Sequence, residues 1–339
     1  MLQFLNKQSY HNNLTITNLS LLPLQKFRTF QLKNKSNQFK GVTWALAGAI
    51  AMSNVYIFSK AALSEIHLFQ FGFYWFGLGL IWNLFYSTKT KKFQQIKGFS
   101  KSSFIAIGII GIMEVVSTSL FFVAIQSAEN PAVISFLADT NPLFVAILGV
   151  VLLKERFNLI ESFGMALIIL GALIISYKGD TGLDNLLIPG TQYILLSVSI
   201  YAVATIYAKT KISVIPPAIL SINRVLLLFV FSTVLLLANG YSVSISWVVF
   251  INLLIGSLLG PFLTGLANYS SLQYIEASKS SIIRSSRSLF VVIGAYVYFG
   301  TLPHATQLIG GLFTLSGVIV ISLGKSFPKS LKKKFRLSS

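Results

Sequence analysis

Five ionisable residues lie inside long apolar segments of this chain, where a charge is costly. Two are acidic, Glu114 and Asp139, and three are basic, Arg224, Arg284 and Arg287. A charge at the centre of a membrane helix costs about 2.5 to 3.5 kcal/mol on insertion scales, so such residues are the best candidates for a ligand site. The surplus of one arginine, with the fit of guanidinium to carboxylate or phosphate, predicts an anionic substrate group, as in an amino acid or a similar zwitterion.

The composition requires a lipid environment for most of the chain. Of the 339 residues, 54% are hydrophobic and 11% are charged, and the mean hydropathy is +0.73. A soluble protein of this length has about 25% charged residues. The net charge of +18 gathers in the tails and in alternate loops, so we do not expect nucleic acid as a partner. The chain contains no Cys, which excludes disulfides and thiolate metal sites.

Ten apolar segments are long enough to cross about 30 Å of hydrocarbon. Proline and asparagine mark two of their beginnings, because Asn130 with Pro131, and Pro216 with Pro217, suit the first positions of a helix. The expected spans are 42–62, 67–87, 102–125, 131–153, 157–177, 190–211, 217–238, 247–271, 279–299 and 305–324.

The distribution of Lys and Arg predicts the orientation in the membrane. Six lie in the N-terminal tail, five between the second and third spans, and six in the C-terminal tail, whereas the odd-numbered loops are nearly bare. We therefore expect both termini to be cytoplasmic, in a multi-pass protein of the plasma membrane, most simply a bacterial inner membrane. An organelle membrane is the alternative.

An internal duplication links the two halves. Residues 142–176 are echoed by residues 288–322 at a constant offset of 146. The matched positions include two glycines and the last serine of each segment: Gly164 and Gly310, Gly171 and Gly317, Ser176 and Ser322. Because five spans is an odd number, the halves at 42–177 and 190–324 must be inverted in the membrane. Inverted repeats are typical of secondary transporters, which bind their substrate near the midplane.

The region after Asp139 also resembles a known family. Pro142, the run from Leu152 to Arg156 with Glu155 in it, and the glycines Gly164 and Gly171 resemble the EamA-type domain of the drug/metabolite transporter superfamily. Lys60 and Arg224 stand where such proteins often carry a basic residue. The resemblance implies a ten-helix transporter or exporter of small metabolites.

The second half departs from the family pattern. Thr301 stands at the position of Glu155, and Ser288 at that of Pro142. A role that needs both glutamates or both prolines is therefore not expected. Our interpretation of Glu155 is an interfacial residue that pairs with Lys154 or Arg156.

The spacing of the polar residues predicts which helices line a substrate path. Arg284 and Arg287 are three residues apart and share a helix face, and Pro142 would free backbone carbonyls near Asp139. We expect the third, fourth, eighth and ninth helices to line the path, with Asn268 from the eighth. Trp75 lies near the repeat position of Arg224 and is a further lining candidate.

Three roles remain open for the acids Glu114 and Asp139. Each can neutralise an arginine, contact the substrate or carry a proton, since a low-dielectric environment favours the neutral form of a carboxyl group. The offset places Asn141 at the position of Arg287, so the acidic segment of one half is expected to face the basic segment of the other across a central cavity.

The leading hypothesis is a secondary transporter that imports or exports a small polar metabolite by alternating access. The alternative is a flippase for a lipid or a lipid-linked sugar. We expect no enzyme, metal or cofactor, because the sequence shows no catalytic constellation and no His placed with carboxylates at ligand spacing. The expected partners are a small-molecule substrate and the bilayer, and a homodimer stays open.

The two tails are basic. Residues 1–41 contain no Asp or Glu, which is typical of a disordered cytoplasmic tail that touches anionic lipid. A transit peptide or a wrongly chosen start codon are the alternatives. Residues 325–339 form the second basic tail.

Overall fold

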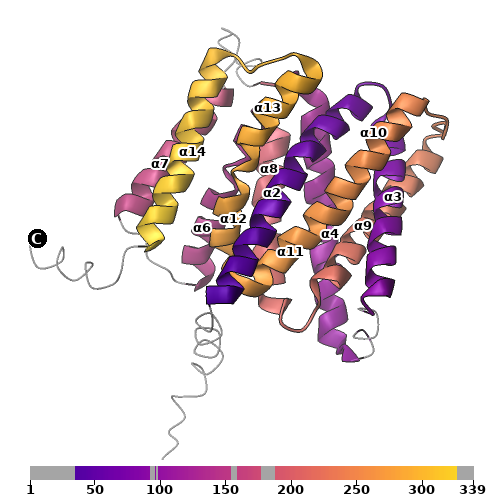
Figure 1. The fold of residues 1–339 in the computed structure, drawn as a ribbon, viewed down its shortest axis with the longest axis horizontal. Coiled ribbons are helices and arrows are strands. Elements are labelled where there is room, and N and C mark those ends of the chain that lie inside the picture. Colours follow the sequence, from indigo (N-terminus) through magenta and orange to yellow (C-terminus); the bar gives the residue numbers. More distant parts are fainter. Residues whose placement is uncertain (1–34, 92–95, 97, 154–158, 177–187, 327–339) are drawn as a thin grey trace, which may run out of the picture.

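The computed structural model describes residues 35–91, 96, 98–153, 159–176 and 188–326, and within these ranges every regular element is a helix (Figure 1). The first half contains α2 (Lys35–Leu63), α3 (Leu68–Lys89), α4 (Lys101–Ser127), α5 (Pro131–Ala138), α6 (Asn141–Leu153) and α7 (Leu159–Ser176). The second half contains α8 (Thr191–Lys211), α9 (Pro217–Ala238), α10 (Trp247–Ser257), the π-helical segment η4 (Leu258–Thr264), α11 (Gly265–Tyr274), α12 (Ala277–Arg284), α13 (Arg287–Phe299) and α14 (Ala305–Ser326).

The helices match the expected spans closely. In the described part of the chain, nine spans are long and apolar enough to cross a membrane, and Ala305–Ile321 is a shorter apolar helix at the place of the tenth. Asn130 caps α5 through a hydrogen bond from the backbone N–H of Ala132, and Pro131 is the first residue of that helix. The expectation of an all-α membrane protein is confirmed.

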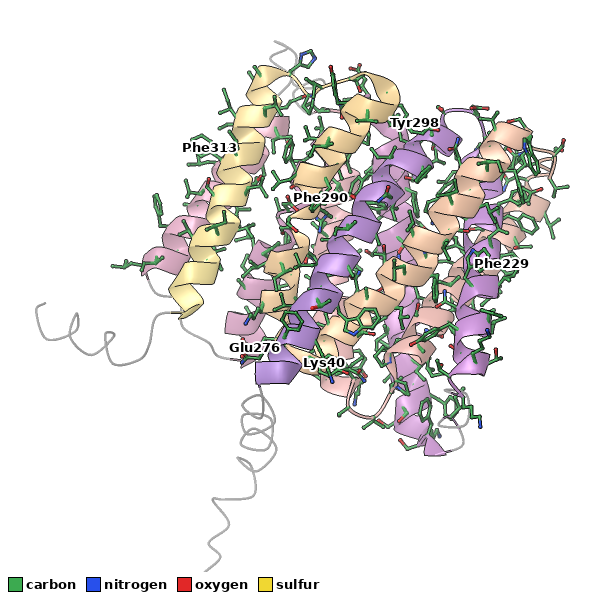
Figure 2. The ribbon with its side chains drawn as sticks, viewed as in Figure 1. Lys40, Phe229, Glu276, Phe290, Tyr298 and Phe313 are labelled. Atoms are coloured by element: carbon green, nitrogen blue, oxygen red, sulfur yellow. The ribbon has the colours of Figure 1, made fainter. Side chains whose placement is uncertain are left out.

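Large apolar side chains cover the outside of the bundle. Figure 2 shows Phe290 and Phe313 along its length, and they are 41% and 38% exposed. The exposed charged residues Lys40 and Glu276 lie together at one end. Apolar surface of this extent suits lipid rather than water.

Two of the expected spans contain a short interruption. The fourth is divided into α5 and α6 at Asp139 and Thr140, and the ninth into α12 and α13 at Ser285 and Ser286. Both spans are present at the expected places, as Pro131–Leu148 and Lys279–Phe299. The two interruptions lie at equivalent positions of the repeat, because the offset of 146 relates Asp139 to Ser285 and Thr140 to Ser286.

The two interruptions differ in the part that proline plays. In the first half, the ring of Pro142 clashes with the carbonyl four residues earlier, and α5 ends at that residue, Ala138. The second half has no proline there. Hydroxyl groups donate to nearby backbone carbonyls at both interruptions: from Thr140 to Leu137 at 2.7 Å in the first half, and from Ser286 to Ile283 at 2.8 Å and Ser288 to Ser285 at 3.0 Å in the second. Such bonds compete with the regular helical pattern.

Pro261 produces a third irregularity, in the eighth span. It lies inside η4, between α10 and α11, where the hydroxyl of Thr264 donates to the carbonyl of Leu259 at 2.9 Å. The carbonyl of Pro261 accepts a hydrogen bond of 3.2 Å from the amide of Asn83. The side chain of a neighbouring helix thus satisfies a backbone group in the irregular segment.

Four glycines allow α7 and α14 to pack backbone against backbone. A Cβ atom on Gly171 would lie 2.6 Å from the carbonyl oxygen of Gly310, and one on Gly164 would lie 2.8 Å from that of Gly317. The earlier glycine of α7 therefore meets the later glycine of α14, so the two helices are antiparallel. This order supports the inverted arrangement of the halves. The two helices lie side by side at one edge of the bundle (Figure 1).

Two lysines make equivalent contacts in the two halves. Lys60, near the end of α2, donates to the carbonyls of Gln126 and Ala128, at 3.3 and 2.5 Å, where α4 ends. Lys209, near the end of α8, donates to the carbonyls of Leu272 and Ile275, at 2.5 and 2.8 Å, where α11 ends. In each half, a lysine of the first helix therefore holds the C-terminus of the third, where carbonyls lack helical partners.

The beginning of α2 and the end of α14 lie at the same end of the bundle (Figure 1). An even number of spans gives this arrangement. The side of the membrane on which that end lies stays a prediction from the loop charges.

Candidate functional site

A cavity of ≈ 90 Å³ lies between the two halves. Its lining comes from α2, α3, α4, α8 and α9, from η4 and α11, and from the helices on both sides of the two interruptions. All four spans that we expected to line the path contribute: the third (α4), the fourth (α5 and α6), the eighth (η4 and α11) and the ninth (α12 and α13). The first, second, sixth and seventh spans, which are α2, α3, α8 and α9, contribute as well. Of the predicted site residues, five line the cavity: Trp75, Arg224, Asn268, Arg284 and Arg287.

Glu114 lies outside the cavity lining, in contact with Arg224. Its Oε2 atom is 3.1 Å from Nε of Arg224, and its Oε1 atom accepts a hydrogen bond of 2.7 Å from the hydroxyl of Tyr269. Only 2% of Glu114 is exposed. A second guanidinium nitrogen of Arg224 donates to the hydroxyl of Thr118 at 3.3 Å. Glu114 thus neutralises Arg224.

Asp139 pairs with Arg287 in the same way. Its Oδ1 atom is 3.1 Å from Nη2 of Arg287, and the residue is fully buried. The expectation that the acidic and basic segments face each other across the cavity was wrong, because the two residues contact each other directly. Arg287 also donates to the backbone carbonyl of Arg284 at 3.4 Å.

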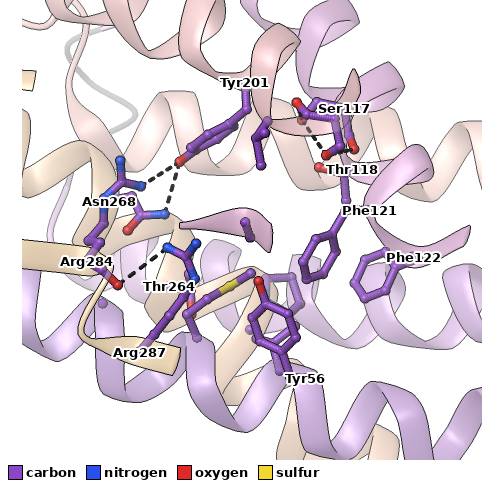
Figure 3. A pocket seen from close by; sticks show the side chains of 18 of the residues that line it. Tyr56, Ser117, Thr118, Phe121, Phe122, Tyr201, Thr264, Asn268, Arg284 and Arg287 are labelled. Carbon is purple, nitrogen blue, oxygen red and sulfur yellow. Dashed lines mark hydrogen bonds between the residues drawn. The ribbon is translucent and has the colours of Figure 1, made fainter. Parts of the chain in front are cut away.

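Arg284 is the arginine without an acidic partner among the described residues. It is 7% exposed and donates from Nη1 to the hydroxyl of Tyr201 at 2.9 Å. Its Nε atom is buried and has no hydrogen-bond acceptor in the described part of the chain. Figure 3 shows Arg284 and Asn268 converging on Tyr201, and the amide of Asn268 also donates to that hydroxyl, at 3.1 Å. Because the Tyr201 oxygen accepts both bonds, its own proton is free to be donated.

Aromatic side chains form the opposite wall. Tyr56 and Phe121 are in edge contact with ring centroids 5.1 Å apart, and Phe122 lies 5.1 Å from Phe121 and 6.0 Å from Trp75. Trp75 is held against α10 and η4, because a Cβ atom on Gly256 or Gly260 would collide with its ring. This wall, defined by Tyr56, Trp75, Phe121 and Phe122, is called the aromatic wall below.

Tyr201 and Tyr269 were not anticipated from the sequence. A signal for Tyr201 was present, since Ser197, Tyr201 and Thr205 recur at intervals of four residues on one face of α8. Asn141 was noted only as the counterpart of Arg287. It donates to the carbonyl of Val198 at 3.1 Å and accepts from Ser281 at 2.7 Å, and so connects α6, α8 and α12.

Two further expectations concern the pairing of Glu155 and the absence of a metal site. Glu155, Lys154 and Arg156 lie outside the described residues. Within the residues that the structure covers, no group of three or more His, Asp or Glu side chains is placed to hold a metal.

Comparisons with known proteins agree with these features. A curated relative, an uncharacterised transporter from Synechocystis sp., is 24% identical over 222 residues, which are 60% of this chain and 61% of that protein. The alignment thus spans about three fifths of the relative's length. A solved structure titled "Crystal structure of protein" is 14% identical, covers 86% of this chain and 98% of its own, and superposes with a TM-score of 0.62, which shows a shared fold.

The model of the EamA-like transporter family matches two segments, residues 39–177 and 188–323. These segments are close to the two halves that the duplication predicted, and together they include every helix that lines the cavity. The resemblance inferred from Pro142, Gly164 and Gly171 is confirmed. The chain is a multi-pass membrane protein and belongs to the EamA-like transporter family.

Proposed function

We propose that this protein is a secondary transporter that moves a small polar metabolite with an anionic group by alternating access. The observation that carries the proposal is the unpaired charge of Arg284 on the cavity surface. A buried charge without a partner costs several kcal/mol. An anionic substrate group would supply the missing partner and accept the hydrogen bonds that Arg284 and Tyr201 still offer.

The two interrupted helices support alternating access. Both interruptions lie beside the cavity, since Ala138, Asn141, Arg284 and Arg287 line it. Helices broken at a central site are typical of secondary transporters, whose repeats rock about the bound substrate. The loop charges favour cytoplasmic termini, and the location that we propose is the plasma membrane, in bacteria the inner membrane.

Transport in proteoliposomes tests the proposal. A metabolite screen by thermal shift on the purified full-length protein would first identify ligands, and uptake and counterflow would follow. We expect Arg284→Gln to lose transport of the anionic substrate. The control is Lys279→Gln on the same helix, where the side chain is exposed and transport should persist.

Two results would overturn the proposal. One is an unchanged affinity of Arg284→Gln for every anionic substrate. The other is flipping of a lipid or lipid-linked sugar without transport of any water-soluble metabolite, which would favour the flippase instead.

A further inference from the structure

The cavity has two chemically different ends. Arg284, Tyr201 and Asn268 form a polar end that is held together by hydrogen bonds of 2.9 and 3.1 Å to the Tyr201 hydroxyl. Phe121 and Phe122 belong to the aromatic wall at the other end (Figure 3). The polar groups at that end are Arg224, which is paired with Glu114, and the hydroxyls of Ser117, Thr118 and Tyr56. A ligand that fills both ends and packs against the rings therefore carries a polar group and an apolar group on the same small molecule.

The charges around the cavity sum to a single positive charge. Glu114 is committed to Arg224, and Asp139 to Arg287, both at 3.1 Å. Neither acid is among the lining residues, and no other Asp or Glu of the described chain lines the cavity. The charge of Arg284 is therefore the one left for a ligand to balance.

We propose that the transported molecule is a small organic monoanion with an aromatic or branched apolar tail and without an ammonium group. This inference rests on the proposed transport function and names its substrate class. A monoanion neutralises Arg284 and leaves no net charge in the site. A zwitterion brings an ammonium group that meets no carboxylate in the lining. The unpaired Oδ1 of Asn268 could accept one hydrogen bond from it but carries no charge, so the second charge of a zwitterion would not be neutralised.

The hydrogen-bond donors at the polar end fit this assignment. Tyr201 has a proton to donate, and Arg284 has a buried Nε–H without an acceptor in the described residues. Both are donors, as a carboxylate requires. The aromatic wall takes the tail, since rings and branched alkyl groups pack well against aromatic faces.

Four compounds with related skeletons separate the contributions of the charged group and of the apolar tail to the binding affinity. 3-Phenylpropanoate is the anion with a tail. Phenylalanine adds an ammonium group to it, 2-phenylethylammonium keeps the tail with a positive charge only, and propanoate keeps the anion without the tail. Equilibrium dialysis of the purified full-length protein gives the affinities. We expect 3-phenylpropanoate to bind at least about tenfold more tightly than each of the other three.

Two variants test which end of the cavity binds the carboxylate and which binds the apolar tail. Arg284→Gln should weaken 3-phenylpropanoate at least about tenfold and weaken the neutral 3-phenylpropanamide less, since the amide loses a hydrogen bond but no charge pairing. A thermal melt in detergent shows whether the variant is folded. Phe121→Leu should weaken 3-phenylpropanoate more than propanoate. Phe73→Leu is its control, because Phe73 is half-buried and does not line the cavity.

The outcomes distinguish the two proposals. If phenylalanine or propanoate binds as well as 3-phenylpropanoate and is exchanged in counterflow, the substrate class is wrong and the transport function stands. If 3-phenylpropanoate binds in a manner that depends on Arg284 and no anion is transported, the site assignment stands and the transport function is wrong.

Discussion

The carboxylate of Asp139 and the guanidinium of Arg287 form a 3.1 Å ion pair that joins the two interrupted helices. Asp139 is the C-cap of α5, and Arg287 is the first residue of α13. A helix carries partial negative charge at its C-terminus and partial positive charge at its N-terminus. Each side chain therefore lies at the less favourable end for its own charge, and the pair offsets both effects.

A double-mutant cycle tests this pairing. Asp139→Asn or Arg287→Gln alone should destabilise the protein by about 3 to 5 kcal/mol, because each leaves a buried charge unpaired. The double variant should lose less than the sum of the two. Thermal unfolding in detergent gives the comparison. Strictly additive losses would contradict a direct pair.

Arg284→Gln should behave in the opposite way. Removing a buried charge that has no acidic partner should leave the unfolding temperature unchanged or raise it, although anion binding is lost. Arg224→Gln, which leaves Glu114 unpaired, should lower it. Parallel thermal melts of the two variants check the contrast. A melting temperature of Arg284→Gln as low as that of Arg224→Gln would show that Arg284 is a structural residue.

We do not expect the ion pairs Glu114–Arg224 and Asp139–Arg287 to couple transport to proton movement. Glu114 and Asp139 are both engaged with arginines at 3.1 Å, so protonation of either one would break an ion pair. We expect an imposed pH gradient not to drive accumulation of the substrate in proteoliposomes. Accumulation driven by such a gradient, and abolished by Glu114→Gln or Asp139→Asn, would instead establish a proton carrier.

The contact between α7 and α14 has no room for side chains at its glycines. Gly171→Ala should destabilise the protein by about 1 to 3 kcal/mol, because the added methyl group would lie 2.6 Å from the Gly310 carbonyl. Gly108→Ala in α4 is the control, since its Cβ atom would meet nothing within 4 Å. Detergent melts of the two variants measure the difference. Equal stability would show that the two helices are not in close contact.

The orientation in the membrane can be mapped directly, because the chain contains no Cys and single cysteines need no altered background. We expect Lys101→Cys and Lys279→Cys to react with an impermeant maleimide from the cytoplasmic side. Ser64→Cys and Thr301→Cys should react from the opposite side. All four positions are exposed. Labelling of all four from one side, or the reverse pattern, would contradict the predicted topology.

The sequence by itself determined the class and the plan of this protein. Apolar runs of span length, the cap at Asn130 and the helix-starting proline Pro217 act over a few residues, so the helices could be placed from the local pattern. The register of 146 between Gly164 and Gly310 revealed the duplication. The cost of charge in lipid also identified the five ionisable candidates without any knowledge of their contacts.

Only the tertiary structure decided how those candidates are used. An ion pair forms only where packing brings a charged nitrogen and oxygen within about 4 Å of each other. Glu114 and Arg224, which form such a pair, lie more than 100 residues apart along the chain. No proline lies near the interruption at Ser285 and Ser286, so the sequence gives no proline signal for it. The same contacts identify the surplus charge: Arg224 and Arg287 pair with Glu114 and Asp139, and among the described residues Arg284 is the arginine without an acidic partner.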